Sequence, residues 1–397
     1  MGERLRASDS TLIADNIMML DSLDTPAAII DVRRMNKNIA LMQARMNALG
    51  VKFRPHVKTS KCLDVVRAQL SAGAQGITVS TLKEAEIFFA AGITDILYAV
   101  SIVSSKLSRA MALRKQGCDL KIIVDNAGAA AGIVAFCRDV NVGEPPEVWI
   151  EVDTDGHRSG ITPEDDALLE IGRILQAGGV KIGGVMTHAG SSYELNTQEA
   201  LAALAGQERA GCVRAAQRLR AAGIACENVS VGSTPTALAA SRLDGVTEVR
   251  AGVYAFFDLV MHNVGVCAID DLALSVLTTV IGHQQDKGWI IVDAGWMAMS
   301  RDRGTSKQSR DFGYGLPCTL DGTPLDGYLM MGANQEHGIL APAGHAPHEG
   351  DLEARFPVGT RLRILPNHAC ATGAQFPEYH ALEPTGELTV WRRFHGW

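Results

Sequence analysis

Short runs of β-branched and other apolar residues alternate along the first two thirds of the chain with longer segments whose apolar residues recur at helical spacing. Two such helical segments, "TLKEAEIFFAAG" from Thr81 and "QERAGCVRAAQRLRAAG" from Gln207, each end at a glycine, the residue that commonly follows a helix. The runs that predict strands lie at 51–57, 75–80, 95–100, 119–125, 146–153, 181–188, 227–232 and 246–250. Eight strand–helix units in succession favour an α/β fold with a (β/α)8 barrel over an open sheet.

The pattern changes after Phe256, where strand-like runs such as "LALSVLTTVIGHQ", "GWIIVDAGW", "RLRILPN" and "ELTVWRRF" are separated by Gly, Pro and Asp. A chain of 397 residues is also longer than one hydrophobic core usually supports. We therefore predict a barrel over 33–257 and a mostly β domain over 258–397. The segment 1–32 contains the strand-like "TPAAIIDV" and is predicted to join the β domain.

Composition narrows the class of protein. Hydrophobic residues make up 47% of the chain and charged residues 20%, which is typical of a folded globular protein. The net charge of −7 argues against a nucleic-acid or anionic-membrane partner, and the apolar runs are too short to span a bilayer. The eight cysteines show no C-x-x-C spacing, so we expect reduced thiols and a cytoplasmic location. A small molecule remains the expected partner.

Lys58 is the first candidate for chemistry. It follows the predicted strand 51–57 within "RPHVKTSK", and barrel enzymes place their active sites at the carboxyl ends of the strands. An amine desolvated there would be a better nucleophile towards a carbonyl. The alternative is a structural lysine that reaches solvent or pairs with an acid.

Other predicted barrel strands end in polar clusters that contain glycine: "EVDTDGHRSG" (151–160), "THAGSSY" (187–193), "VGSTPT" (231–236) and "RAGVY" (250–254). A Gly-Ser-Thr turn after a late strand can offer N–H groups and hydroxyls to a phosphate, although such turns are common for structural reasons alone. Three features together indicate pyridoxal phosphate (PLP). They are a nucleophilic lysine, a turn after a late barrel strand that could bind phosphate, and an imidazole that could lie against the ring of the cofactor.

These motifs, with "GANQEHG" and "PNHACAT", resemble the PLP enzymes of the alanine-racemase fold (fold type III) that act on D-configured β-hydroxy amino acids, a group of aldolases and dehydratases. The resemblance runs from about Thr25 to Trp397. It implies a homodimer with PLP on Lys58, a ring contact at His188 with Tyr193 nearby, Arg158 near the phenolic oxygen and Arg250 at the pyridine nitrogen. The residues implied at the phosphate are Gly232, Ser233, Thr234, Gly252, Val253 and, beside them, Tyr254.

His368 and Cys370 form a candidate metal pair. They are two residues apart, so on an extended strand both side chains would point to the same side. Imidazole and thiolate suit Zn²⁺, and Mn²⁺, Co²⁺ or Mg²⁺ are also candidates. Taken alone, the pair more often marks a buried thiol beside a hydrogen-bonded histidine. The resemblance implies a metal, and the cysteine, which aldolases of the group replace by aspartate, implies a dehydratase.

The resemblance therefore implies a PLP- and divalent-metal-dependent dehydratase, an ammonia-lyase that converts D-threo-3-hydroxyaspartate, and related β-hydroxy amino acids such as D-serine, into a 2-oxo acid and ammonia. Its runner-up is metal-activated aldol cleavage to glycine and an aldehyde. A racemase would need a second base, but "VDAGWMAMS" contains Trp296 and no tyrosine. His337 is a candidate catalytic residue, or part of a hydrogen-bonded turn. The candidates for the second substrate carboxylate are Arg54, Arg158, Arg301 and His337.

Overall fold

The structure, a computed structural model, describes residues 19–141, 143–345 and 350–397. The described residues divide into two compact units, 19–38 with 255–395 (the β unit) and 39–254 with 396–397 (the barrel unit). Part of the predicted segment 1–32, its first eighteen residues, lies outside the described chain.

The barrel unit contains eight parallel strands in the order β2-β9-β8-β7-β6-β5-β4-β3. Their bounds are β2 Lys52–Pro55, β3 Ile77–Val79, β4 Asp95–Ser101, β5 Asp119–Val124, β6 Glu147–Glu151, β7 Ile182–Met186, β8 Asn228–Val231 and β9 Glu248–Ala251. The first and last strands meet through a parallel bridge between His56 and Thr78, where Val57 N–H also donates to Thr78 O over 2.9 Å. The predicted fold class is confirmed, because each predicted strand range overlaps one of these strands, although β4 and β9 each extend one residue beyond the predicted end.

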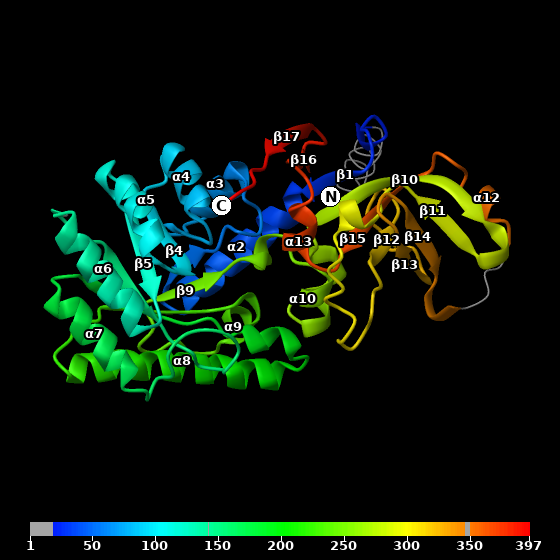
Figure 1. Ribbon diagram of the computed structural model, residues 1–397. Helices are drawn as coiled ribbons and strands as arrows, with labels where there is room; N and C mark the ends of the chain where they lie inside the picture. The colour runs from blue at the N-terminus through cyan, green and yellow to red at the C-terminus, as the bar shows by residue number, and fades with distance from the viewer. Residues whose placement is uncertain (1–18, 142, 346–349) are drawn as a thin grey trace, which may run out of the picture. The chain divides into compact units, whose positions relative to one another are not determined.

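Helices lie outside the strands of the barrel unit (Figure 1). They are α3 Leu63–Ser71, α4 Leu82–Ala90, α5 Ser104–Lys115, α6 Ala127–Asp139, α7 Ala167–Ala177, α8 Gln198–Ala221 and α9 Thr234–Ala239, while α2, Val32–Ala48, runs from one unit into the other. In α7 the buried residues Leu168, Ile171, Gly172 and Leu175 recur at three and four positions, so one face packs inward.

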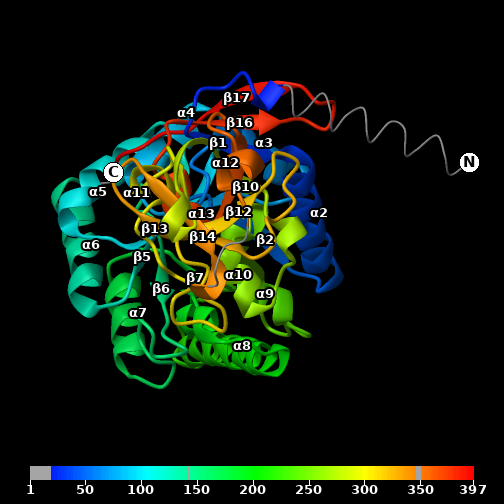
Figure 2. The same ribbon diagram turned by 90° about the vertical axis from the view of Figure 1, so that its right-hand side faces the viewer.

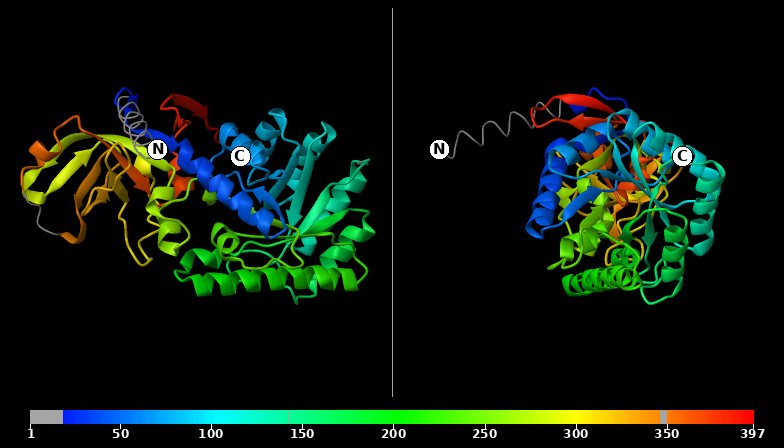
Figure 3. Two further views of the ribbon diagram at one scale, coloured as in Figure 1. Left: turned by 180° about the vertical axis from the view of Figure 1, so that it is seen from behind. Right: turned by 90° about the vertical axis from the view of Figure 1, so that its left-hand side faces the viewer.

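The longest described helix, α8, is the long green helix of Figure 3. It begins nearer the N-terminus than the pattern from Gln207 indicates. It starts at Gln198, after the N-cap Thr197, whose hydroxyl accepts a hydrogen bond from Ala200 N–H over 3.2 Å. The alanine-rich stretch between these points has little contrast between apolar and polar positions, so periodicity did not reveal the first turns.

The β unit is built on a nine-stranded sheet whose main path is β13-β14-β11-β10-β1-β16-β17, with β15 pairing β10 and β12. The strands are β1 Ala27–Asp31, β10 Leu274–Gln284, β11 Trp289–Val292, β12 Gly315–Cys318, β13 Tyr328–Ala333, β14 Gly338–Pro342, β15 Arg361–Pro366, β16 Glu378–Leu382 and β17 Leu388–Arg392. Short helices α10 Leu259–Val264, α11 Trp296–Met299, α12 Leu352–Arg355 and α13 Ala369–Gly373 connect them.

The early strand β1 lies inside this sheet, antiparallel to β10 and parallel to β16 (Figure 2). Its residue Ile29 is fully buried in a cluster with Leu277 and Leu382. Strands β12, β13, β14 and β16 were missed by the sequence pattern, because glycine and proline interrupt the first three and β16 alternates with polar residues. Within the described chain, no helix has the length and apolar character needed to cross a membrane.

Candidate active site

Lys58 lies in the turn that follows β2, at the carboxyl end of the barrel. The turn is fixed by Lys61, whose N–H donates to Val57 O over 2.9 Å and whose ammonium lies 3.2 Å from the fully buried carboxylate of Glu84. Lys61 also adopts a left-handed backbone conformation, with φ of 43°. Lys58 itself is exposed, so the expected desolvation of its amine is not present in the structure.

His188, after β7, is an imidazole whose neutral form is favoured by its surroundings. Its Nδ1 lies 3.1 Å from Gly232 O. Burial lowers the pKa of His188, the charges of Lys58, Arg158 and Arg250 lower it further, and the hydrogen bond to Gly232 only partly opposes them, which leaves the pKa at about 3. The structure therefore brings Lys58, Arg158 and Arg250 within electrostatic range of one ring. The ring of Tyr193, on the short helix η1 (Gly190–Glu194), is centred 6.1 Å from that of His188.

The turn after β8 is shaped by Gly232, whose φ is 131°. A Cβ atom at this position would lie 2.2 Å from Arg250 O, so only glycine fits. The N–H of Gly232 donates to Glu208 over 2.9 Å, and that of Ser233 donates to the Thr236 hydroxyl over 3.0 Å. Both N–H groups therefore have acceptors inside the protein.

Thr234 differs from its two neighbours. Its hydroxyl oxygen is buried and makes no hydrogen bond with any other described residue, and the residue as a whole is 1% exposed. A buried hydroxyl without a partner is costly, so this atom marks a place where an oxygen-rich ligand would be favoured.

The end of β9 supplies the remaining predicted contacts. Arg250 is buried and donates to the hydroxyl of Ser230 over 2.6 Å, and burial lowers its pKa although neighbouring carboxylates raise it. A Cβ on Gly252 would lie 3.0 Å from His56 O, so the chain passes close to the Lys58 turn. Val253 is buried, and so is Tyr254, whose hydroxyl accepts a hydrogen bond from Gln69 on α3 over 2.9 Å.

The cationic candidates for a substrate carboxylate separate into two kinds. Arg54 is buried and donates to Glu248 over 2.7 Å and to both oxygens of Asp95, so it is committed inside the barrel and is not a substrate ligand. Arg158 is exposed after β6, with a nitrogen 3.7 Å from the buried carboxylate of Glu151. The hypothesis for Arg54 is therefore corrected, because sequence alone did not reveal its two acidic partners.

The pair His368 and Cys370 is found in the β unit, but its backbone differs from the predicted extended strand. His368 is the N-cap of α13 and has extended dihedral angles, whereas Cys370 lies within that helix. A hydrogen bond nevertheless joins the two side chains. The prediction of an extended strand through this pair was wrong, because the helix begins directly after the histidine.

Two acidic residues that sequence reasoning missed support this pair. The Nδ1 atom of His368 lies 2.6 Å from Asp302 Oδ2, and the buried carboxylate of Asp258 accepts the N–H of Ala369 over 2.9 Å. Burial lowers the pKa of His368, but Cys370 and the hydrogen bond to Asp302 outweigh it and raise the pKa to about 11. Among the described residues, no three His, Cys, Asp or Glu side chains are arranged to hold a metal ion.

His337 and Arg301 also belong to the β unit. His337 is exposed in the turn between β13 and β14, where its carbonyl accepts the N–H of Asn334 over 2.8 Å. The guanidinium of Arg301 stacks over the ring of Trp296, with 4.1 Å between its central carbon and the ring centre. The role of His337 stays a prediction.

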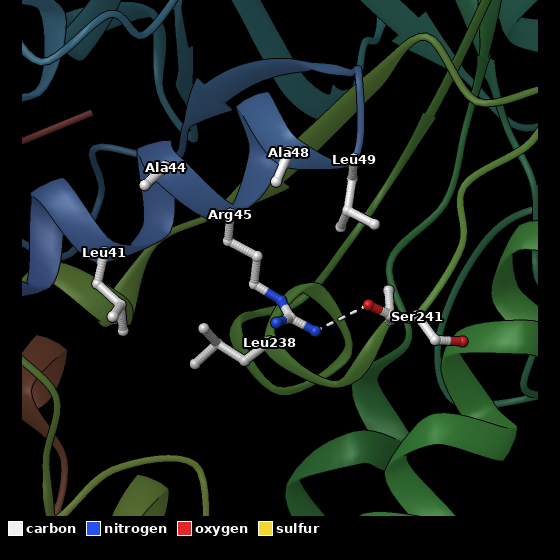
Figure 4. A pocket seen from close by; sticks show the side chains of 8 residues that line it. Leu41, Ala44, Arg45, Ala48, Leu49, Leu238 and Ser241 are labelled. Atoms are coloured by element: carbon white, nitrogen blue, oxygen red, sulfur yellow. Dashed lines mark hydrogen bonds between the residues drawn. The ribbon is translucent and has the colours of Figure 1, made fainter.

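A pocket of about 460 Å³ lies elsewhere on the barrel unit, between α2 and the end of α9 (Figure 4). Leu41, Leu49 and Leu238 give it an apolar wall, and Arg45 crosses it to donate to Ala240 O over 2.8 Å. None of the candidate residues lines it, so this pocket is not the candidate active site.

The parallel barrel places Lys58, His188 and Arg250 at the carboxyl ends of its strands, which is where barrel enzymes have their active sites. The fold and the site are therefore those of a barrel enzyme that also has a mixed β-sheet. The chain belongs to the family described as "Alanine racemase, N-terminal domain", whose model matches residues 30–260. Residues 273–382 match a second family, described as "Putative serine dehydratase domain".

Individual relatives agree with this assignment. The chain is 68% identical over 377 residues to D-threo-3-hydroxyaspartate dehydratase of Delftia sp. (strain HT23), which covers 95% of this chain and 98% of the relative. The solved structure of the Delftia sp. HT23 dehydratase superposes with a TM-score of 0.94, covering 95% of this chain and 99% of that one. A cysteine-to-alanine mutant of D-threo-3-hydroxyaspartate dehydratase, solved in the metal-free form, is also 68% identical and gives a TM-score of 0.93, with coverage of 95% and 99%.

Proposed function

We propose that this chain is a PLP- and divalent-metal-dependent dehydratase that converts D-threo-3-hydroxyaspartate into oxaloacetate and ammonia. The observation that carries the proposal is the 68% identity to D-threo-3-hydroxyaspartate dehydratase across nearly the full length of both chains. The site residues of the barrel unit and the His368–Cys370 pair supply the chemistry that such a reaction requires.

The residues of the barrel unit fit PLP. Lys58 lies at a strand end where a cofactor aldehyde can reach its amine, and the unpartnered hydroxyl of Thr234 fits a phosphate oxygen. Gly232 and Gly252 keep the chain close to Arg250 and His56 in places where a side chain would clash. We assign Gly232 and Ser233 to shaping the turn, because their N–H groups already have acceptors, and Thr234, Gly252 and Val253 to the phosphate.

When bound, PLP withdraws electron density from the α-carbon of the amino acid. Lys58 would hold the cofactor, and its amine would be the base that accepts the α-proton. His188 supplies a flat neutral ring face, with Tyr193 beside it. Arg250 would donate a hydrogen bond to the pyridine nitrogen without transferring its proton. Arg158 would donate a hydrogen bond to the phenolic oxygen.

The donor set of His368 and Cys370 fits a divalent metal. Asp302 occupies Nδ1 of His368, which leaves Nε2 as the ligand atom and fixes the orientation of the ring. A metal held there would act as a Lewis acid on the β-hydroxyl, since hydroxide is a poor leaving group. Imidazole and thiolate favour Zn²⁺, and Mn²⁺ or Co²⁺ suits them better than Mg²⁺.

The overall reaction balances without an external oxidant. The α-proton and the β-hydroxyl leave as water, and hydrolysis of the resulting free imine consumes one water, so 3-hydroxyaspartate yields oxaloacetate and ammonia. A catalytic role for His337, D-serine as a further substrate, a homodimer and a cytoplasmic location belong to the same proposal. The eight free thiols are compatible with the proposed location.

The test is product analysis of the purified PLP-containing protein given D-threo-3-hydroxyaspartate, before and after treatment with EDTA. We expect oxaloacetate and ammonia, lost on chelation and restored by Zn²⁺ or Mn²⁺. Cys370→Ala should keep the absorbance of bound PLP but lose turnover, whereas Lys58→Ala should lose both. Glycine and glyoxylate as products would instead identify an aldolase, and turnover that survives complete metal removal would exclude the metal from the mechanism.

A further inference from the structure

Glu208 is a buried carboxylate to which the sequence pattern gave no role. It lies on α8 and is 2% exposed. One of its oxygens, Oε1, accepts the N–H of Ala189 over 3.0 Å and the N–H of Gly232 over 2.9 Å. Ala189 directly follows His188, and Gly232 directly precedes the Ser233–Thr234 turn, so one oxygen atom connects the loops that follow β7 and β8.

Further contacts join the same two loops. The hydroxyls of Ser192 and Ser233 lie 2.8 Å apart, and Nδ1 of His188 lies 3.1 Å from Gly232 O. The hydroxyl of Thr236 also hydrogen bonds to the Glu208 carboxyl group. The proposed ring contact and the proposed phosphate turn are therefore one hydrogen-bonded assembly, with Glu208 supporting it from the helix side.

The conformation of Gly232 explains why this support matters. Glycine can adopt the φ of 131° found at Gly232, but it can adopt many other backbone conformations as well. An acceptor fixed beside the N–H of Gly232 selects the observed conformation. If Glu208 lost its oxygen, the buried N–H groups of Ala189 and Gly232 would both lack that acceptor. The loops would then relax towards other partners, and the Thr234 hydroxyl and the His188 ring would lose their defined positions.

We propose that Glu208 is a positioning residue for PLP, which acts through His188 on the ring and through Gly232 on the phosphate turn. The inference rests on the proposed function, since it assumes that PLP binds to these loops. Glu208 does not touch the cofactor. Its contribution is an acceptor oxygen that fixes the ring contact and the phosphate turn relative to each other.

The experiment measures the dissociation constant of PLP and the ³¹P resonance of bound PLP in the full-length protein. We expect Glu208→Ala to weaken PLP binding by at least about tenfold, as loss of an acceptor shared by two buried donors implies, and to shift or broaden the resonance. Glu208→Gln retains an amide oxygen at the same place and should bind PLP within about threefold of wild type with an unchanged resonance.

The matched control is Cys212→Ala, one turn further along α8. Cys212 is fully buried, and its sulfur donates to Ser230 O over 3.7 Å, which lies on strand β8 and not in the loop that follows it. This variant should lower the unfolding midpoint without moving the ³¹P resonance. An equal effect of Glu208→Ala and Cys212→Ala on PLP binding would mean that Glu208 is merely structural.

Wild-type affinity and an unchanged resonance in Glu208→Ala would overturn the inference. If that variant does not fold, Glu208→Asp tests the inference instead. Aspartate keeps the carboxyl group, but its side chain is one methylene shorter, so the oxygen lies farther from the N–H groups of Ala189 and Gly232. The PLP affinity of this variant should fall and its resonance should move, and an unchanged Asp variant would also overturn the inference. Failure of the wild-type protein to bind PLP would instead refute the proposed function, so the two failures are distinguishable.

Discussion

His188 is an imidazole held among cations. Burial is the main cause that lowers its pKa, and the charges of Lys58, Arg158 and Arg250 lower the pKa further. A neutral ring can lie against a cofactor without adding a further positive charge to a site that already contains a lysine and two arginines. The low pKa of His188 therefore follows from its burial and, secondly, from the cations that the barrel places around it.

This shift predicts how stability depends on pH. The pKa of His188 is about 3 in the folded protein and about 6.5 when the chain is unfolded, so the unfolded state binds more protons between these values. The free energy of unfolding should therefore fall as pH falls from 6.5 towards 3. His188→Asn removes this contribution, so the stability advantage of wild type over the variant should shrink across the window. Urea unfolding of both proteins at several pH values measures it, and a constant advantage would contradict the assigned pKa.

At the scale of elements, α4 shows how a helix end can support the turn that contains Lys58. Its N-cap Thr81 accepts the N–H of Glu84 over 3.0 Å, and the same Glu84 carboxylate pairs with Lys61 in the Lys58 turn. One glutamate therefore belongs both to the helix start and to the turn after β2.

We predict that Thr81→Ala lowers the free energy of unfolding by about 1 kcal/mol, because the N–H of Glu84 loses its cap. Thr81→Ser keeps the hydroxyl and should cost much less. Asn126→Ala removes the comparable cap of α6, where Asn126 accepts the N–H of Ala129 over 2.7 Å, and should cost a similar amount without affecting the Lys58 turn. Urea midpoints compare the three variants, and equal stability of Thr81→Ala and Thr81→Ser would show that the hydroxyl contributes nothing.

At the scale of the molecule, a chain of ion pairs links several strands of the barrel, with Arg54 and Glu248 buried and Asp95 half-exposed. Arg54 on β2 binds Glu248 on β9 and Asp95 on β4, and Lys121 on β5 lies 2.5 Å from Asp95. Glu248 also accepts from Ser230, which in turn accepts from Arg250. Polar contacts therefore run from the interior of the barrel to the strand end at which Arg250 lies.

Glu248→Gln should be strongly destabilising, by about 3–5 kcal/mol, because it removes one counter-charge from the buried guanidinium of Arg54. Asp119→Asn is the matched control, since Asp119 pairs with Lys121 but its side chain is 58% exposed, and it should cost less than about 1 kcal/mol. Chemical denaturation of the two variants provides the comparison. If Glu248→Gln were as mild as Asp119→Asn, the barrel would not depend on this chain of charges.

The barrel could be predicted from the sequence because buried parallel strands appear there as continuous apolar runs. β5, "DLKIIV", is buried in its last five residues, and each predicted barrel strand appears at its expected place. The β unit was harder to predict, because β12 and β14 are short and contain proline. Their pairing also depends on partner strands far along the chain.

The sequence by itself determined the order of the barrel strands, the position of Lys58 at a strand end and the residue types of the His368–Cys370 pair, because periodicity and local motifs follow from neighbours in the chain. Only the tertiary structure decided that Arg54 is committed to Glu248 and Asp95, that α13 begins between His368 and Cys370, and that Glu208 supports two loops. The physical reason is that burial and hydrogen-bond partners are set by residues distant in sequence, which meet only when the chain has folded.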